Sequence, residues 1–129
     1  MWENIKHFKQ HEFDSPDKKG SGANMQESFV RKLDEARAIA DTAFSITSGY
    51  RTPAHNKKVG GVANSSHVTG YAADIAVKSN SARFKILSAL QSVGFNRIGI
   101  GKGFIHVDND PTKPQNTVWV YATLKDIEG

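Results

Sequence analysis

The chain has 129 residues, a formal net charge of +4 and no cysteine. This length is typical of one domain with a single hydrophobic core. Without cysteine the chain has no disulfide, no thiolate metal site and no cysteine nucleophile, so a metal ion would be bound by histidine and carboxylate side chains. The basic charge favours polyanionic surroundings, without choosing among nucleic acid, anionic lipid and wall polymers.

The amino-terminal segment, residues 1–10, is polar and lacks the apolar core of a secretory signal. No stretch approaches the roughly 20 apolar residues that span a bilayer. We therefore expect a protein made in the cytoplasm, without a membrane span. Residues 14–24 are rich in Gly, Ser, Asp and Lys without periodicity, which predicts a surface loop between an N-terminal arm and the body. We expect one domain over 1–129, with the arm and loop in 1–24 and the body, which carries the candidate site described below, in 25–122.

The first half of the body shows three elements in chain order. Apolar residues at helical spacing, with charges on the opposite face, predict an amphipathic helix over residues 25–41. Alternation of apolar and small polar residues predicts a strand over 44–50. Thr52 followed by Pro53 is typical of a helix start, so we expect a short helix over 53–59.

The second half of the body predicts more strands than helices. A strand over 71–77 precedes a second amphipathic helix, which Ser79 or Asn80 caps and Gly94 ends. Three further strands follow, over 97–100, 103–107 and 118–122. This order predicts an α+β fold, in which helices pack against a small, mostly antiparallel sheet. Trp119 and Tyr121 share one face of the last strand, and we expect them in the core, with a cleft wall as the alternative.

Three segments concentrate polar residues that a solvated surface would not need: 48–51, 66–74 and 104–108. His67 and Asp74 lie seven residues apart, and a loop that ends in a strand can direct both side chains toward one point. His106 lies inside a strand whose alternation puts Asp108 on the same face. Two histidines and one carboxylate leave a fourth tetrahedral position for water, as in catalytic zinc sites.

This pattern predicts one Zn²⁺ bound by His67, Asp74 and His106. Zinc would lower the pKa of a bound water toward about 7 and polarise a substrate carbonyl. Asp108 is then either the general base or the partner that orients an imidazole. Arg51, in a turn after a strand, is placed to bind a substrate carboxylate or a developing oxyanion.

The remaining histidines and the basic residues have simpler interpretations. We expect His55 on the surface, and His7 and His11 in solvated or docking positions of the arm. Lysine and arginine doublets are dispersed, and no recognition helix or aromatic stacking motif accompanies them. We therefore expect no nucleic-acid binding, and we interpret the charge as solubility plus attraction to an anionic wall.

The segments SGYRTPAHN, SSHVTGYAADI and FIHVD resemble those of the zinc D-alanyl-D-alanine carboxypeptidase and murein endopeptidase family, which includes phage endolysins and shares its fold with the hedgehog signalling domain. The resemblance runs from about Phe44 to Tyr121. It implies that His67, Asp74 and His106 bind zinc, and that Arg51 contacts the substrate or the transition state. It also implies hydrolysis of a peptide bond in the stem peptides of bacterial peptidoglycan.

The sequence departs from this family at the general base. Several branches have an acidic residue three positions before the last zinc histidine, or a histidine two positions before it; here Gly103 and Phe104 occupy those positions. Asp108 is our candidate base because another branch shares the His-Val-Asp form of this strand. We also expect four pocket-lining residues that bind substrate beside Arg51: Ser48, Tyr50, Ser66 and Thr69.

Two alternatives stay open on sequence grounds. Within enzymes, a carboxypeptidase that trims a terminal D-alanine competes with an endopeptidase that opens crosslinks. Outside enzymes, the chain could be a zinc-stabilised binding module, as in the hedgehog relatives. We expect a monomer that acts on peptidoglycan peptides of the cell wall, in the periplasm or outside the cell. The lack of a signal and of a wall-binding domain favours a phage lysin or a virion component.

Overall fold

The computed structural model describes residues 1–121. Five strands form one sheet in the order β1-β2-β4-β3-β5, with bounds Ile46–Ser48 (β1), Ala72–Ala76 (β2), Arg97–Ile100 (β3), Phe104–Asp108 (β4) and Thr117–Val120 (β5). All pairs are antiparallel except β3 with β5, which is parallel. The helices are α1 (Glu27–Ile39), α2 (Pro53–Lys58) and α3 (Asn80–Ser92). The prediction of an α+β fold with a mostly antiparallel sheet is confirmed.

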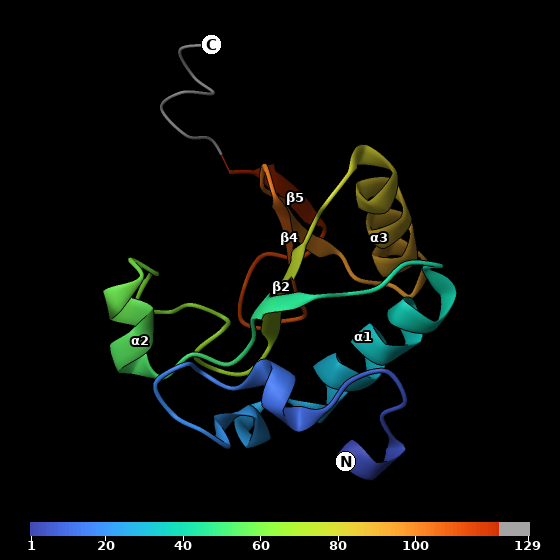
Figure 1. Ribbon diagram of the computed structural model, residues 1–129. Helices are drawn as coiled ribbons and strands as arrows, with labels where there is room; N and C mark the ends of the chain where they lie inside the picture. The colour runs from blue at the N-terminus through green and yellow to red at the C-terminus, as the bar shows by residue number, and fades with distance from the viewer. Residues whose placement is uncertain (122–129) are drawn as a thin grey trace.

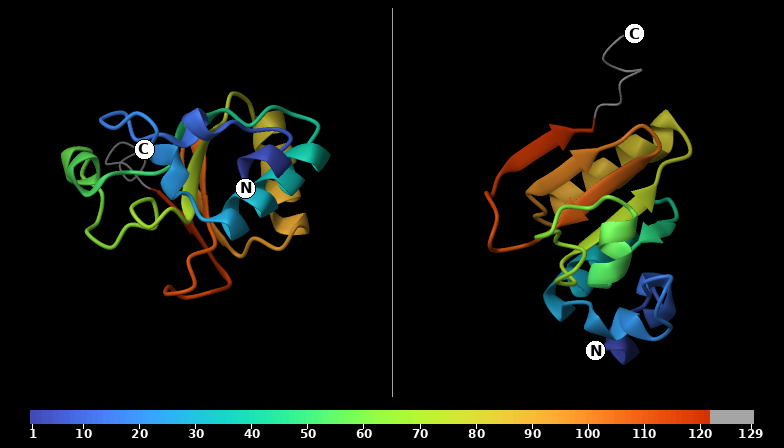
Figure 2. Two further views of the ribbon diagram at one scale, coloured as in Figure 1. Left: turned by 90° about the horizontal axis from the view of Figure 1, so that it is seen from below. Right: turned by 90° about the vertical axis from the view of Figure 1, so that its left-hand side faces the viewer.

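The sheet separates two unequal layers (Figures 1 and 2). Helices α1 and α3 pack side by side against one face, whereas α2 and long loops lie on the other side. Strand β4 shows why the faces differ, because Ile105 and Val107 are fully buried in the core while His106 and Asp108 alternate with them toward the loop side. None of the helices in residues 1–121 is long and apolar enough to cross a membrane.

Most predicted elements occur with shifted ends. Helix α1 begins at Glu27 and stops at Ile39, and Asp41 follows with a left-handed φ of 55°. The strand predicted over 44–50 is reduced to β1. It ends there because the Tyr50 N–H donates to the Phe13 carbonyl at 2.9 Å instead of to a strand. The last strand begins at Thr117, one residue early, and residue 122 lies outside the described part.

The prediction of a surface loop over 14–24 is wrong in part. The Asp14 carboxylate accepts the Gly20 and Gly22 N–H groups at 3.0 and 2.7 Å, and Ser21 is buried in a short 3-10 helix, Ser21–Asn24. Two other 3-10 helices precede it, Trp2–Asn4 and Gln10–Phe13. These turns give no apolar periodicity, so the sequence pattern did not reveal them.

The N-terminal arm is part of the hydrophobic core. Phe13 is fully buried and packs edge-to-face on Phe8, with ring centroids 5.5 Å apart. Phe8 in turn lies 6.4 Å from the ring of Phe44, which precedes β1. Aromatic side chains of this size dominate the apolar area that a small core buries. The arm therefore contributes to the same core as the body.

Candidate metal centre

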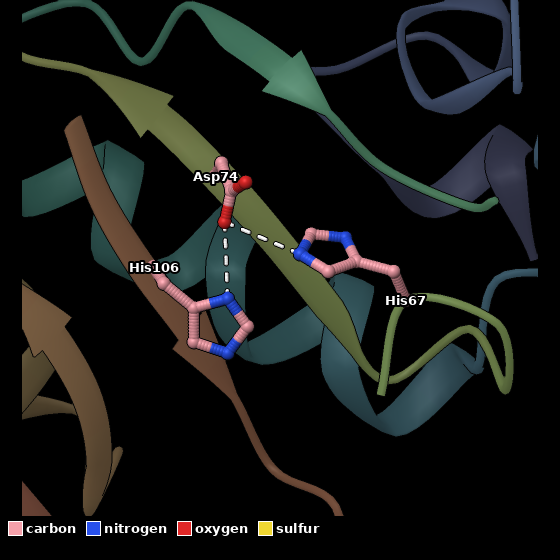
Figure 3. A group of neighbouring side chains, drawn as sticks. All are labelled: His67, Asp74 and His106. Atoms are coloured by element: carbon pink, nitrogen blue, oxygen red, sulfur yellow. Dashed lines mark hydrogen bonds and ion pairs between the residues drawn. The ribbon is translucent and has the colours of Figure 1, made fainter. Parts of the chain in front are cut away.

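Three side chains meet on the loop side of the sheet (Figure 3). Asp74 projects from β2 and His106 from β4, and the two residues are directly paired across the antiparallel strands. Asp74 Oδ1 lies 3.0 Å from His106 Nδ1 and 3.2 Å from His67 Nε2. One ligand atom from each residue lies within 4.8 Å of the other two. The structure thus brings together the three residues that the sequence predicts as zinc ligands.

His67 reaches this point from a loop, not from a strand. Gly70 turns the loop with a φ of 81°, and a Cβ at this position would collide with the Asn24 carbonyl oxygen. The Arg51 N–H donates to the His67 carbonyl at 3.1 Å, which ties the loop to the chain after β1. A glycine is needed here both for its backbone conformation and for the close approach.

The hydrogen bonding of His67 leaves one ring nitrogen for a metal. Nδ1 lies 2.8 Å from the Gly49 carbonyl oxygen, which only accepts, so Nδ1 carries the proton and donates. In the neutral ring Nε2 then presents a lone pair to the Asp74 carboxylate. This nitrogen is buried and makes no hydrogen bond of acceptable geometry within residues 1–121, although Asp74 Oδ1 is 3.2 Å away. A lone pair that faces a carboxylate oxygen is repelled by it, and a cation bound between the two atoms would replace this repulsion with two attractions.

His106 is arranged in the same way from the other side. Its Nε2 lies 2.8 Å from Asp108 Oδ2, so in the neutral ring a proton on Nε2 leaves the Nδ1 lone pair facing Asp74. Burial lowers the pKa of His106, but hydrogen bonds to Asp108 and Asp74 outweigh it and raise this pKa above its ordinary value. Burial raises the pKa of Asp74, but the hydrogen bond from His106 and the positive charge of the two imidazoles when protonated hold it well below its usual range.

The donor set suits zinc. Two imidazole nitrogens and one carboxylate oxygen converge, and this combination is typical of catalytic zinc with an open position. The buried, unpartnered Nε2 of His67 is the observation that a metal explains best, because a buried polar atom without a partner is costly. The residues therefore fit the predicted ion.

Arg51 is fixed beside the cluster formed by His67, Asp74 and His106. Its Nε donates to Ser48 Oγ at 3.0 Å and its Nη1 to Asn56 Oδ1 at 3.2 Å, while Nη2 lies 3.5 Å from Asp74 Oδ2. Asn56 is buried within α2, and its own amide donates to the Val62 carbonyl at 2.8 Å. Asn56 was not predicted as a site residue, because its only signal in the sequence was its place in the short helix after Pro53.

A cavity of 410 Å³ opens over the cluster. Arg51 and Ser66 line it, whereas Ser48, Tyr50 and Thr69 are not among its lining residues in the described part of the chain. Ser48 instead holds Arg51, and Tyr50 packs against the core. Ser66 is only 2% exposed, and its hydroxyl donates to Asp110 at 2.7 Å. Thr69 is exposed and donates to the Ser66 carbonyl at 3.2 Å.

The prediction that Trp119 and Tyr121 lie in the core is wrong, because both line this cavity. Their rings lie over Gly99, where an added Cβ would come within 2.6 Å of both side chains. Phe104 extends the surface, with its ring centroid 5.2 Å from that of Tyr121. The Trp119 ring centroid is 5.6 Å from that of His106. We call Phe104, Trp119 and Tyr121 the aromatic wall.

Asp108 is buried behind His106. It is 1% exposed, and Arg97 Nε donates to its Oδ1 at 2.7 Å while Oδ2 faces His106. Burial raises the pKa of Asp108, but hydrogen bonds from His106 and Arg97 outweigh this effect and lower the pKa. Arg97 also donates to the Pro114 carbonyl at 2.6 Å. No motif pointed to Arg97, because an arginine at a strand start is commonly solvent-exposed.

The other histidines lie away from the cluster. His7 and His11 are exposed in the arm and His55 is half-buried in α2, and none belongs to a metal-binding group among residues 1–121.

Comparison with known proteins gives one informative result. A family model described as Peptidase M15 matches residues 6–108, which include Arg51, His67, Asp74 and His106. No curated protein matches the chain. The match spans most of the chain and the fold agrees with it, and peptidases of this family depend on zinc. The chain therefore belongs to the peptidase M15 family of zinc-dependent metallopeptidases.

Proposed function

We propose that the protein hydrolyses a peptide bond in the stem peptides of bacterial peptidoglycan. The observation that carries this proposal is the convergence of His67 Nε2, Asp74 Oδ1 and His106 Nδ1 in an open cavity beside Arg51. A single bound zinc ion would supply an activated water and polarise the scissile carbonyl. The net charge of +4 would favour approach to an anionic wall polymer.

Arg51 is the residue that we assign to substrate binding. Three contacts hold its guanidinium in place, so little side-chain entropy is lost when a substrate oxygen binds. A terminal carboxylate at this position would suit a carboxypeptidase, and a developing oxyanion would suit either activity. Both activities therefore remain within the proposal.

We assign Asp108 to positioning His106 and not to the role of general base. Both of its oxygens are already occupied, by Arg97 and by His106, and the carboxylate is buried with a lowered pKa. A general base needs access to the proton that it takes and a pKa near the working pH. Asp108 instead fixes the ring orientation and the tautomer that leaves Nδ1 free for metal.

A second candidate is a zinc-stabilised binding module without catalysis. One observation favours it: among the cavity-lining residues of the described part, the carboxylates are Asp74, a proposed ligand, and Asp108, which is occupied. Binding of the same wall peptides would then replace their hydrolysis.

We further propose that the protein acts as a monomer on the cell wall, in the periplasm or outside the cell. We propose that it serves there as a phage lysin or as a component of a virion.

The decisive experiment incubates purified zinc-loaded protein with peptidoglycan, with and without a chelator, and identifies products by mass spectrometry. Release of D-alanine would indicate a carboxypeptidase, and conversion of crosslinked dimers to monomers an endopeptidase. An Asp74→Ala variant is the matched control, because it removes the carboxylate that faces both histidines. Bound zinc with neither released D-alanine nor conversion of dimers would contradict the enzyme and leave the binding module.

A further inference from the structure

The loop that carries His67 is anchored to the segment after β4 by one buried hydrogen bond. The hydroxyl of Ser66 donates to Asp110 Oδ2 at 2.7 Å, and the two residues are 2% and 3% exposed. Ser66 immediately precedes His67, and Asp110 lies two residues beyond the end of β4. The bond therefore crosses between the two parts of the chain that supply the histidines.

Asp110 is itself held from the other side. Its Oδ1 accepts the Thr112 N–H at 3.0 Å and the Thr112 hydroxyl at 2.7 Å. Its own N–H donates to Asp108 Oδ1 at 3.1 Å, and the second oxygen of Asp108 faces His106. Through Ser66 and Asp108, one buried residue is thus connected to both histidines of the cluster.

This connection matters more for His67 than for the other two ligands. Asp74 and His106 are fixed by direct pairing of β2 with β4, whereas His67 belongs to a loop with no strand partner. Outer hydrogen bonds set the orientation of metal ligands, and loop ligands need such support most. Ser66 provides this support by donating its hydroxyl proton to Asp110.

We propose that Asp110 is a positioning residue for the metal, which sets the spacing of His67 and His106 through Ser66 and Asp108. The inference rests on the proposed zinc site. It predicts that Ser66 and Asp110 affect metal affinity as one unit, although in the described part of the chain neither is hydrogen-bonded to a proposed metal-binding atom.

The test measures zinc affinity by competition with a chromophoric chelator, for the wild type and for Ser66→Ala and Asp110→Ala. We expect the zinc Kd of both variants to rise about tenfold, a size typical for partners behind a metal ligand. Ser21→Ala is the matched control, because Ser21 is also 2% exposed and accepts a 2.7 Å hydrogen bond from the Ser15 N–H, and neither residue lines the cavity in the described part of the chain. Its zinc Kd should stay that of the wild type.

Two further variants separate positioning from general destabilisation. The double variant Ser66→Ala/Asp110→Ala should bind zinc no more weakly than the weaker-binding single variant, because both substitutions remove the Ser66–Asp110 bond. Asp110→Asn keeps the shape and can donate to Ser66 Oγ, so its Kd should lie within about threefold of the wild type. Urea unfolding of the zinc-free proteins reports stability separately.

Several results would overturn the inference. Unchanged zinc affinity in Ser66→Ala and Asp110→Ala would exclude a positioning role, and so would additive losses in the double variant. A loss in Asp110→Asn as large as in Asp110→Ala would point to the charge and not to the hydrogen bond. A wild type that binds no zinc would remove the zinc site and this inference together, which distinguishes that failure from the others.

Discussion

His106 Nε2 and Asp108 Oδ2 are 2.8 Å apart, on the side of the ring away from Asp74. This pairing keeps the proton on Nε2 and leaves Nδ1 for a metal. Asp108→Ala should therefore weaken zinc binding by about 10- to 100-fold. It should also lower the free energy of unfolding by about 3–5 kcal/mol, because Arg97 would stay buried without its partner. Equilibrium dialysis and urea unfolding measure the two effects. Normal zinc affinity with lost hydrolysis would instead restore Asp108 as the base.

Arg51→Lys should lower kcat/KM by about 100-fold while zinc stays bound. Lysine keeps the charge, but it cannot donate to Ser48 and Asn56 and still present a planar fork to the substrate. The measurement is steady-state hydrolysis of a defined stem peptide, together with the zinc content of the variant. Arg31→Lys, on the exposed face of α1 in an i,i+4 pair with Glu27, is the control and should keep full activity. Equal activity of Arg51→Lys and wild type would exclude Arg51 from substrate binding.

Removal of zinc should lower the melting temperature as well as abolish hydrolysis. His67 and His106 are 39 residues apart, and a metal that binds only the folded chain stabilises it by about 4 kcal/mol at a zinc concentration 1,000-fold above the Kd. In a domain of this size that corresponds to a decrease of about 10 °C or more. Calorimetry with and without chelator measures it, and Asp74→Ala should show no response. An unchanged melting temperature in the wild type would exclude a stabilising role of the metal and leave only a role in hydrolysis.

Asp110 should make the folded state sensitive to acid. Burial raises its pKa, but hydrogen bonds from Thr112 and Ser66 outweigh burial and lower the pKa below the ordinary 3.8. The unfolded state thus binds the proton more readily, so the stabilisation is present above pH 3.8 and is lost as the pH falls through the folded-state pKa. The difference in unfolding free energy between zinc-free wild type and Asp110→Asn should shrink below about pH 4. A difference that is constant from pH 3 to 7 would contradict this assignment.

The aromatic wall should affect substrate binding more than metal binding. Trp119→Ala removes a ring that lines the cavity 5.6 Å from His106, so we expect a higher KM for wall peptides and an unchanged zinc Kd. Gly99→Ala should act similarly, because its Cβ would displace both Trp119 and Tyr121. Val118→Ala is the control, because Val118 is an exposed residue of β5, the strand that carries Trp119, and the KM of this variant should stay that of the wild type. A KM unaffected by Trp119→Ala would exclude the wall from substrate contact.

The parts of the fold that the sequence predicted are those with strong local periodicity. Helices α1 and α3 and strand β4 follow regular apolar patterns, and their predicted places are confirmed. The turns of residues 10–24 depend on side-chain hydrogen bonds such as those of Asp14, which leave no periodic trace. The sequence also did not predict which strand pairs with the last one, because the parallel pairing of β5 with β3 depends on contacts between distant segments and not on a local pattern.

In the candidate site, too, some residues could be predicted from local sequence and others could not. Residue type and spacing were enough to name His67, Asp74 and His106, since few side chains bind zinc and strand alternation fixes faces. The residues that hold them were harder to predict: Arg97 and Asp110 carried no motif, and Ser66, predicted to bind substrate, also donates its hydroxyl to Asp110 in the structure. Their roles arise from hydrogen bonds between segments distant in sequence, such as Ser66 to Asp110 across 44 residues. Such bonds become visible only in three dimensions.

The contact between Gly49 and the arm has a practical consequence for shortening the chain. The Gly49 carbonyl orients His67, and an added Cβ at Gly49 would lie 2.6 Å from the Phe13 Cα, so the arm is packed directly behind a residue that sets the metal site. The Tyr50 N–H is bonded to the same Phe13. A catalytic body cut at residue 25 would lose this backing. The smallest version of this protein that still binds its metal should thus begin ahead of Phe8, and a fusion partner is better joined at Met1 than inside the arm.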